Sequence, residues 1–194
     1  MAEEYAGRKF TTEFVGKKIV KSAEASSIVS LSKKLRGLGF LHGIPGNFSR
    51  RTMQGFAITA GGVAKDKITE EDVVEVLDYD EKENTIYATG LKEPSSEARM
   101  HWMIYKRFPE VNAILHVHDQ TILDNETKAK EAGAVYTKRE FPYGTIELAK
   151  QAVDTLSQWD YIVMVNHGPV AVGSSLDSAL ELVKSTHRKV AEIR

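Results

Sequence analysis

Three histidines have the residue type and the spacing to bind one metal ion together. His116 and His118 lie two residues apart in residues 112–118, an apolar and β-branched segment typical of a buried strand. Residues two apart on a strand point to the same face, so both imidazoles can converge on one ion. His167 follows the apolar residues 161–165 in a glycine turn, where it can reach the end of a neighbouring strand. Three imidazoles plus a carboxylate or water form a four-coordinate zinc site with an open catalytic position, although an isolated His-x-His pair is equally compatible with one core and one surface histidine.

Glu97 is the candidate carboxylate for this site. It ends the sequence Pro94-Ser95-Ser96-Glu97, at the start of a predicted helix that continues to Arg107. An acid in the first turn of a helix is also a common stabilising residue without a catalytic role, because it interacts favourably with the helix dipole. The same helix N-terminus offers free N–H groups and the hydroxyls of Ser95 and Ser96, which together could bind a phosphate.

Two glycine-containing loops can supply further donors to the same anion. Asn47 lies in residues 46–49, which read GNFS, and Gly62 lies in residues 59–62, which read TAGG. The backbone N–H groups of such loops, together with an amide side chain, are suitable ligands for a phosphate. Glycine turns are common, so neither loop identifies a binding site by itself.

The other polar residues near these motifs have two interpretations each. His101 lies four residues after Glu97, on the same face of the predicted helix, where it can either support the site or pack in the core. The basic residues of this region are expected to be solvated surface charges, with one or more at the rim of a phosphate pocket: Arg50, Arg51, Lys65, Lys67 and Lys92.

The rest of the sequence predicts alternating helices and strands that would position these residues. Apolar residues at spacings of three and four predict a helix over residues 12–38, and the glycines and proline of residues 43–51 predict a turn. Further strands are expected at 55–59, 73–77, 85–88, 112–118, 161–165 and 169–172, and further helices at 95–107, 121–132, 146–156 and 176–193. This alternation, without a linker or a repeat, predicts a single α/β domain over residues 1–194.

The composition excludes several classes of partner. With 26 Lys and Arg against 27 Asp and Glu, the formal charge is −1, so the chain lacks the positive field on which non-specific binding to nucleic acid or anionic membranes depends. No cysteine is available for a disulfide or a thiolate metal site. No apolar stretch approaches the ~20 residues that cross a bilayer, nor does the N-terminus resemble a signal peptide. We therefore expect a cytoplasmic protein that binds neither membranes nor nucleic acid.

Six motifs in a fixed order resemble the class II aldolase/adducin head-domain family. They are GNFS at 46–49, ITAGG at 58–62, DVV at 72–74, PSSE at 94–97 with His101, NAILHVH at 112–118, and NHG at 166–168 with Gly173 and Ala179. The resemblance covers about residues 20–190. It implies a three-layer α/β/α domain around a largely antiparallel sheet, and a homotetramer with active sites at the subunit interfaces.

The resemblance also implies a role for each candidate residue. His116, His118 and His167 would be zinc ligands, and Glu97 would be the catalytic acid/base and in some relatives a fourth ligand. The family's ribulose-phosphate 4-epimerases typically carry Asp at this position, so the sequence is more similar to the fuculose-phosphate and rhamnulose-phosphate aldolases. Such an enzyme would cleave a ketose 1-phosphate to dihydroxyacetone phosphate and a small aldehyde by retro-aldol chemistry. The substrate phosphate would be bound by Asn47, Gly62, Ser95 and Ser96.

Two segments depart from the pattern of these aldolases. The TAGG loop at 59–62 stands where they usually have Thr-Pro-Ser/Thr-Gly, so one hydroxyl donor is replaced by backbone. Residues 119–140 are polar where relatives usually carry a catalytic tyrosine that acts across the subunit interface, and Tyr136 is our candidate for it, with Tyr143 as the alternative. Other reactions on the same scaffold stay open: 4-epimerisation, dehydration of methylthioribulose phosphate, decarboxylation, or a non-catalytic adducin-like interaction. Cobalt, manganese or iron could also replace zinc.

Overall fold

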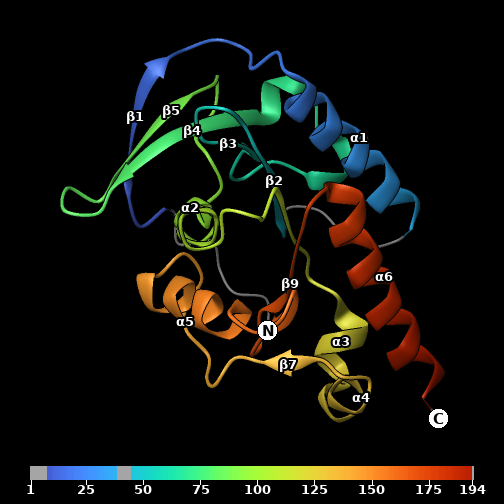
Figure 1. Cartoon of the computed structure of the whole chain (residues 1–194). Coiled ribbons are helices and arrows are strands. Elements are labelled where there is room, and N and C mark those ends of the chain that lie inside the picture. The colour runs from blue at the N-terminus through green and yellow to red at the C-terminus, as the bar shows by residue number, and fades with distance from the viewer. Residues whose placement is uncertain (1–7, 39–44, 194) are drawn as a thin grey trace.

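The computed structural model describes residues 8–38 and 45–193, and these residues form a nine-stranded sheet with helices on both sides (Figure 1). The strand order is β1-β5-β4-β3-β2-β6-β9-β8-β7. The strands are β1 (Thr11–Gly16), β2 (Asn47–Arg51), β3 (Phe56–Thr59), β4 (Val73–Asp80), β5 (Thr85–Thr89), β6 (Ala113–His116), β7 (Val135–Tyr136), β8 (Tyr161–Met164) and β9 (Gly168–Gly173). The helices are α1 (Ala23–Gly37), α2 (Ala98–Arg107), α3 (Gln120–Asp124), α4 (Glu126–Glu131), α5 (Ile146–Leu156) and α6 (Leu176–Glu192), with 3₁₀ turns at Lys65–Lys67 and Glu70–Asp72.

Two pairs of helices cover the two faces of the sheet. Helices α1 and α6 pack on one face, and α2 and α5 pack on the other (Figure 1). The core under α1 and α6 includes Phe48, Leu115 and Val183, and the core under α2 and α5 includes Ile58 and Ile104. The prediction of a three-layer α/β/α architecture is therefore confirmed.

The sheet is mixed, which corrects the expectation of a largely antiparallel one. Neighbouring strands are antiparallel in the interior, but β1 pairs parallel with β5 at one edge and β7 pairs parallel with β8 at the other. At the second edge, α5 lies between β7 and β8 in the chain. A crossover through a helix returns the chain in the same direction, so the two strands that it connects are parallel.

The N-terminal helix is shorter than predicted. One helix was expected over residues 12–38, whereas the structure forms β1 and then α1. Ser22 begins α1 by accepting a hydrogen bond from the Ala25 N–H, and the segment before it pairs with β5 in the sheet. Phe14 and Val15 matched the helical spacing, but backbone pairing at the edge of the sheet determines their conformation.

The segment predicted as a turn at residues 43–51 contains a central strand. Residues from Asn47 onward form β2, which lies between β3 and β6, while residues 43 and 44 lie outside the described part of the chain. Asn47 and Ser49 are buried on this strand, at 3% and 0% exposure. Sequence periodicity cannot identify such a strand, because one of its two buried faces is polar and is stabilised by partners elsewhere in the fold.

The remaining elements agree with the sequence except in one region. The predicted strands and helices coincide with β3, β4, β5, β6, β8, β9, α2, α5 and α6 to within a few residues. The helix expected at 121–132 is divided into α3 and α4, because Asn125 has a non-helical conformation with φ −129° and ψ 50°. The short strand β7 was not predicted.

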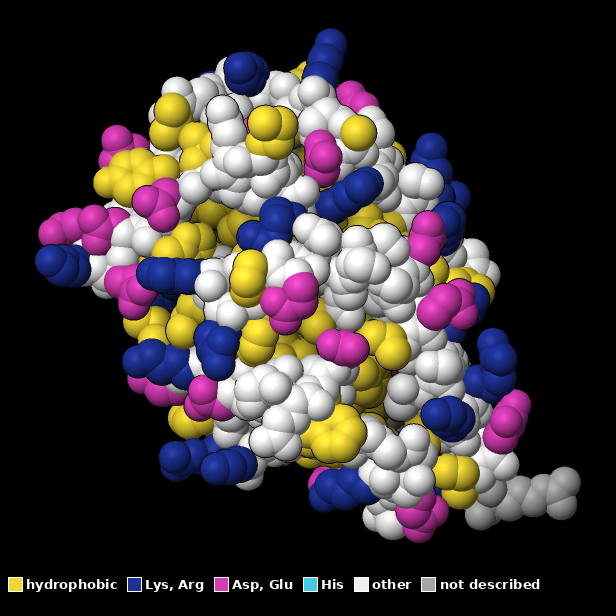
Figure 2. All heavy atoms as spheres, in the orientation of Figure 1, with side chains coloured by type: hydrophobic (Ala, Val, Ile, Leu, Met, Phe, Trp, Pro, Cys, Tyr) yellow, Lys and Arg dark blue, Asp and Glu magenta, His cyan; other side chains and the backbone are white. Residues whose placement is uncertain are grey.

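No helix in the described part of the chain is long and apolar enough to cross a membrane. The face of the molecule in Figure 2 carries acidic and basic side chains interspersed with one another. This distribution agrees with the formal charge of −1 and shows no extended patch of one sign on that face.

Candidate active site

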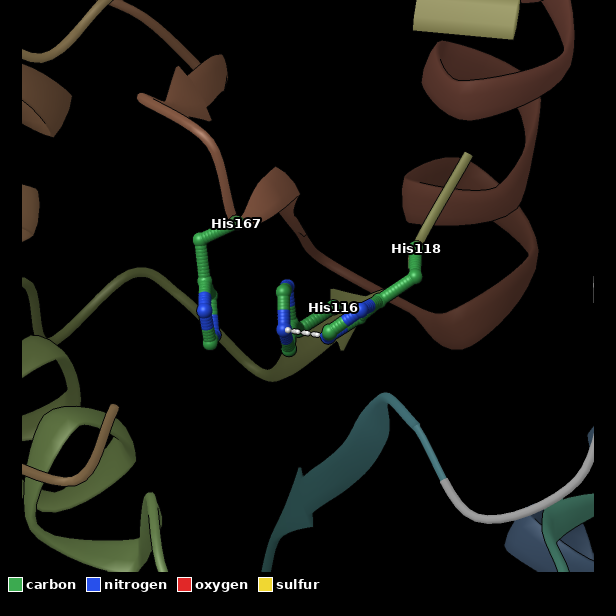
Figure 3. A group of neighbouring side chains, drawn as sticks. All are labelled: His116, His118 and His167. Carbon is green, nitrogen blue, oxygen red and sulfur yellow. Dashed lines mark hydrogen bonds between the residues drawn. The ribbon is translucent and has the colours of Figure 1, made fainter. Parts of the chain in front are cut away.

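Two neighbouring strand ends bring the three histidines together (Figure 3). His116 is the last residue of β6, which pairs with β9, and His118 follows two residues later. His167 lies in the tight turn between β8 and β9, directly before Gly168. Gly168 has a φ of 143°, and a Cβ on it would collide with the carbonyl oxygen of Val117. Glycine at this position therefore lets the turn approach the segment that carries the other two histidines.

The three imidazoles lie close enough to share one ion. One ring nitrogen of each residue lies within 4.8 Å of the corresponding atoms of the other two. The Nε2 atoms of His116 and His118 are 3.2 Å apart, and the rings of His116 and His167 are nearly parallel, with centroids 5.0 Å apart (Figure 3). The structure thus groups the three histidines that the sequence singled out.

Burial keeps two of these imidazoles in the form that can bind a cation. The pKa of His118 is lowered to about 3 and that of His116 is also lowered, in both cases mainly because burial disfavours the charged ring. The Nδ1–H of His116 donates to the Pro169 carbonyl at 2.9 Å, which leaves the lone pair on Nε2 facing the cluster. Neutral imidazoles next to a carboxylate are a donor set that fits zinc or a similar divalent ion.

Glu97 supplies that carboxylate. It is the N-cap residue of α2 and is only 4% exposed. Its Oε1 accepts a hydrogen bond from His167 Nε2 at 2.8 Å, and its Oε2 lies 3.4 Å from His116 Nε2. Burial by itself would raise the pKa of Glu97, but His116, His167 and the hydrogen bonds from His167 and Asn47 hold it well below its usual value. The cluster therefore contains an ionised carboxylate beside the histidines.

Two of the four predicted phosphate-binding residues contact Glu97 directly. Asn47 pairs with His116 in the sheet and donates from Nδ2 to Glu97 Oε2 at 2.6 Å. The Oγ of Ser95 accepts a hydrogen bond from the Glu97 N–H at 3.3 Å. An amide nitrogen carries two hydrogens, so Asn47 can donate to Glu97 and to a ligand at the same time.

The other two predicted phosphate-binding residues border the same region. The Ser95 N–H donates to the Thr59 carbonyl at 3.1 Å, so the loop at 59–62 lies beside the start of α2. Gly62 has a φ of 69°, and no described atom lies within 4 Å of the position that its Cβ would take, so its backbone is accessible. The carbonyl of Ser96 packs closely against the turn that precedes α5.

Lys65 was expected to be a solvated surface charge, but the structure buries it. It is only 2% exposed, and its Nζ donates to the Ala60 and Val63 carbonyls at 3.1 and 2.9 Å. Burial lowers its pKa to about 8. Lys65 therefore lies beneath the loop at 59–62 and holds it in shape. No signal in the sequence distinguishes it from its exposed neighbour Lys67.

Tyr136 forms no hydrogen bond with Glu97 in the described part of the chain. It is on β7, its hydroxyl donates to the Ile122 carbonyl at 3.3 Å, and burial raises its pKa to about 12. Tyr143, the alternative, is buried, and its carbonyl accepts a hydrogen bond from Lys9 Nζ. A catalytic role for Tyr136 stays a prediction, because it requires a neighbouring subunit.

His101 contacts the candidate site through Asn47. The ring is fully buried, its Nε2 lies 2.6 Å from Asn47 Oδ1, and its Nδ1 lies 2.6 Å from Ser49 Oγ. Of the two interpretations that the sequence allowed, the contacts favour support of the site. The sequence did not identify Ser49 as a partner, although it lies two residues after Asn47 and so on the same face of β2.

Comparison with known sequences agrees with this arrangement of residues. Residues 26–193 match the family described as Class II Aldolase and Adducin N-terminal domain. A 5-methylthioribulose-1-phosphate/5-deoxyribulose-1-phosphate aldolase of Escherichia coli O45:K1 is 28% identical over 84% of this chain and 79% of that protein. The L-fuculose phosphate aldolase of Escherichia coli K12 is 29% identical over 81% of this chain and 76% of its own. A methylthioribulose-1-phosphate dehydratase of Pseudoalteromonas translucida is 34% identical, but over only 54% of this chain and 48% of its own.

Solved structures show the same fold. An L-fuculose 1-phosphate aldolase superposes with a TM-score of 0.74 at 26% identity, covering 89% of this chain and 85% of its own. A sugar-phosphate aldolase of Thermotoga maritima gives a TM-score of 0.74 at 20% identity, covering 86% of this chain and 91% of its own. At the lower identity the similarity extends to the fold alone.

Proposed function

Because this chain belongs to the class II aldolase and adducin N-terminal domain family and is an enzyme of the class II aldolase type, we propose that it is a zinc-dependent sugar-phosphate aldolase. It would cleave a ketose 1-phosphate to dihydroxyacetone phosphate and a small aldehyde. The observation that carries this proposal is the buried Glu97 carboxylate beside the cluster of three histidines. Its Oε1 lies 2.8 Å from Nε2 of His167. A protein that served only in assembly would have no need of such a group.

In this proposal His116, His118 and His167 hold the metal. When bound, the ion would act as a Lewis acid and polarise the carbonyl of the ketose. Glu97 is ionised, so with dihydroxyacetone phosphate it would act as a base and remove the proton from the carbon next to the carbonyl. In the cleavage direction the same carboxyl group would return that proton to carbon.

The phosphate would lie between the start of α2 and the loop at 59–62. Asn47, Gly62, Ser95 and Ser96 would bind it through amide, hydroxyl and backbone N–H donors. The N-terminal end of α2 attracts an anion through the helix dipole. The buried cation of Lys65 beneath the loop adds to this positive field.

A second candidate is the dehydration of methylthioribulose 1-phosphate. The observation that favours it is the 34% identity of part of this chain to a dehydratase of that name, while a relative similar over more of the chain is named an aldolase for a methylthioribulose or deoxyribulose phosphate. Both reactions would begin with a 1-phosphorylated ketose at the same residues. Their products differ, since dehydration releases water and keeps the carbon chain intact.

The first test is solvent deuterium exchange into dihydroxyacetone phosphate, followed by proton NMR. Zinc-loaded protein is compared with protein treated with a chelator. We expect stereospecific exchange at the carbon that bears the hydroxyl group. This exchange should be lost when the metal is removed by the chelator. Absence of exchange in protein shown to contain zinc would contradict the aldolase proposal. Methylthioribulose 1-phosphate would then be supplied, and release of water without carbon–carbon cleavage would identify a dehydratase.

The family also suggests the setting of this site. We propose a cytoplasmic homotetramer in which each site lies at a subunit interface, with Tyr136 contributed by a neighbouring chain. Light scattering of the purified protein would give the mass of the assembly. If the enzyme is active as a monomer, Tyr136 does not act as a catalytic tyrosine across an interface.

A further inference from the structure

A continuous row of hydrogen bonds leads from the interior of the α2 layer to Glu97. The Tyr105 hydroxyl and Ser49 Oγ are 2.9 Å apart, and Ser49 Oγ is 2.6 Å from His101 Nδ1. His101 Nε2 is 2.6 Å from Asn47 Oδ1, and Asn47 Nδ2 is 2.6 Å from Glu97 Oε2. All of these residues are buried. The row is therefore shielded from water along its length, where hydrogen bonds are stronger and unpaired groups are costly.

Two secondary-structure elements alternate along this row. Glu97, His101 and Tyr105 are spaced four residues apart and so lie on one face of α2. Asn47 and Ser49 are two residues apart and so lie on one face of β2. The hydrogen bonds thus join the helix to the strand at each step. Rotation of any one side chain would break a contact on the opposite element.

The direction of each hydrogen bond follows from Glu97. An ionised carboxylate can only accept, so the Asn47 NH₂ group faces Glu97 and its carbonyl oxygen faces His101. His101 must then donate from Nε2. Burial lowers the pKa of His101 to about 3, so the ring is neutral and its Nδ1 accepts from the Ser49 hydroxyl. Ser49 in turn accepts from the Tyr105 hydroxyl.

We propose that His101 is a positioning residue: as the Nε2–H tautomer it holds the Asn47 amide with its NH₂ group toward Glu97 and thereby fixes the carboxylate beside the three histidines. If His101 could not donate, the Asn47 amide would be free to rotate. Its carbonyl oxygen could then face the Glu97 carboxylate, and the two oxygens would repel each other. The effect on proton transfer rests on the proposed aldolase function. The effect on the orientation of Glu97 does not.

Core packing alone does not account for a histidine at this place. His101 also lies next to Phe56, with ring centroids 6.4 Å apart, beside the apolar core under α2 and α5. Burial of an imidazole is unfavourable unless both ring nitrogens are hydrogen-bonded, whereas a leucine or phenylalanine would fill the same space without that cost. Both nitrogens are bonded here, and the bonds lead to Glu97.

The tautomer can be measured without any assumption about the reaction. Zinc-free protein labelled with ¹⁵N-histidine would be examined by two-bond ¹H–¹⁵N correlation, and the His101 signals assigned by their loss in H101Q. We expect a neutral Nε2–H ring between pH 5 and pH 8. A Nδ1–H tautomer, or a ring that becomes charged in this range, would overturn the proposal because neither can hold Asn47 in this orientation.

The second experiment compares variants that remove different links of the row. H101L removes the donor to Asn47, and H101Q replaces it with an amide N–H at a similar distance from the backbone. Y105F is the matched control, because it removes a buried hydroxyl from the same helix face but leaves the His101 to Asn47 bond intact. Circular dichroism and a thermal melt would establish which variants are folded, and if H101L is not, the tautomer of His101 in the parent protein decides the proposal.

Two readouts are taken on the folded variants. Zinc alone, in competition with a chromophoric chelator, should bind about 10- to 100-fold more weakly to H101L, the range typical for groups that orient metal-site residues. H101Q should recover most of this loss, and Y105F should stay within about 3-fold of the parent protein. Equal zinc affinity in H101L and the parent would overturn the proposal.

The exchange assay separates this proposal from the proposed function. With dihydroxyacetone phosphate at saturation, we expect the exchange rate of H101L to fall about 10- to 100-fold and its KM to change about 3-fold or less. If the parent protein shows no exchange, the aldolase proposal fails, while the tautomer and the zinc affinity still decide the role of His101. A parent-like exchange rate in H101L would overturn that role in an active aldolase.

Discussion

The two faces of β2 have opposite characters although they belong to the same five residues. Phe48 points into the apolar core under α1 and α6, while Asn47 and Ser49 point to α2 and form the buried polar row that ends at Glu97. On strand β6, Leu115 belongs to the core under α1 and α6, while the opposite face carries Ile114 of the core under α2 and α5 and, at the strand end, His116 of the site. The period of two along a strand thus separates stabilisation of the fold from the chemistry of the site.

This comparison makes Glu97 the position with the largest expected effect on activity. We expect E97Q to fold and to be loaded at saturating zinc, but to lose the exchange of dihydroxyacetone phosphate by about 10²- to 10⁴-fold, because an amide cannot remove the proton. NMR of the exchange reaction and a zinc titration would measure both. Turnover equal to that of the parent protein would show that Glu97 is not the base.

On the apolar face of β2, we expect a substitution to change the stability of the fold and not the activity. Phe48 is 0% exposed, so F48A should lower the free energy of unfolding by about 3–5 kcal/mol through loss of apolar burial and a residual cavity. Urea denaturation followed by circular dichroism would measure the loss. Below the transition, the exchange rate per zinc-loaded molecule should stay near that of the parent protein. A loss of activity without a loss of stability would mean that the two faces are not separate.

The buried histidines around the site should make stability depend on pH near neutrality, and His116 and His118, whose pKa values are also lowered, act in the same direction as His101. The pKa of His101 is lowered from 6.5 to about 3 in the folded protein, so below pH 6.5 the unfolded chain binds a proton that the folded chain does not. Stability should therefore fall as the pH decreases from 6.5, by about 2 kcal/mol at pH 5 from His101. Glu97, whose pKa is also lowered, adds to this loss only below about pH 4.5.

The measurement compares urea midpoints at pH 7 and pH 5 for zinc-free parent protein, H101L and F48A. H101L should lose less stability between the two pH values than the parent does. F48A should show the same difference as the parent, because it changes no titratable group. An equal pH dependence in H101L and the parent would argue against a neutral buried ring.

The smallest effect on activity is expected from Lys65, which lies beneath the loop at 59–62. K65M removes the bonds from Nζ to the Ala60 and Val63 carbonyls and should raise the KM for dihydroxyacetone phosphate about 5-fold, with kcat within about 2-fold. K67M is the matched control, since Lys67 lies two residues away and is exposed. A KM in K65M equal to that in K67M would show that the loop keeps its shape without the buried cation.

The sequence predicted the parts of the site that depend on local spacing. His116 and His118 are two residues apart on a strand, and that spacing alone directs both rings to one face. The sequence placed the start of a helix at residue 95, and the structure begins α2 three residues later, at Ala98, with Glu97 as its N-cap. These features depend on a few neighbouring residues, and so they can be read from the chain without knowledge of the fold.

The sequence did not predict the features that depend on residues far apart in the chain. The segment of strand β2 was predicted as a turn because of the glycines and proline near it, and the polar face of the strand is stable only when α2 provides partners for Asn47 and Ser49. Lys65 looked like a surface charge because its neighbours are polar, yet the loop above it buries its ammonium group.

The sequence by itself determined the alternation of strands and helices, the three histidines, Glu97 and the family to which they point. Only the tertiary structure decided which way the polar side chains face and which partners they find. Asn47 and Glu97 are 50 residues apart in the chain, and their contact exists because β2 and α2 pack against each other. The hydrophobic pattern determines which faces are buried, but a buried polar group is stable only where the complete fold supplies its hydrogen bonds.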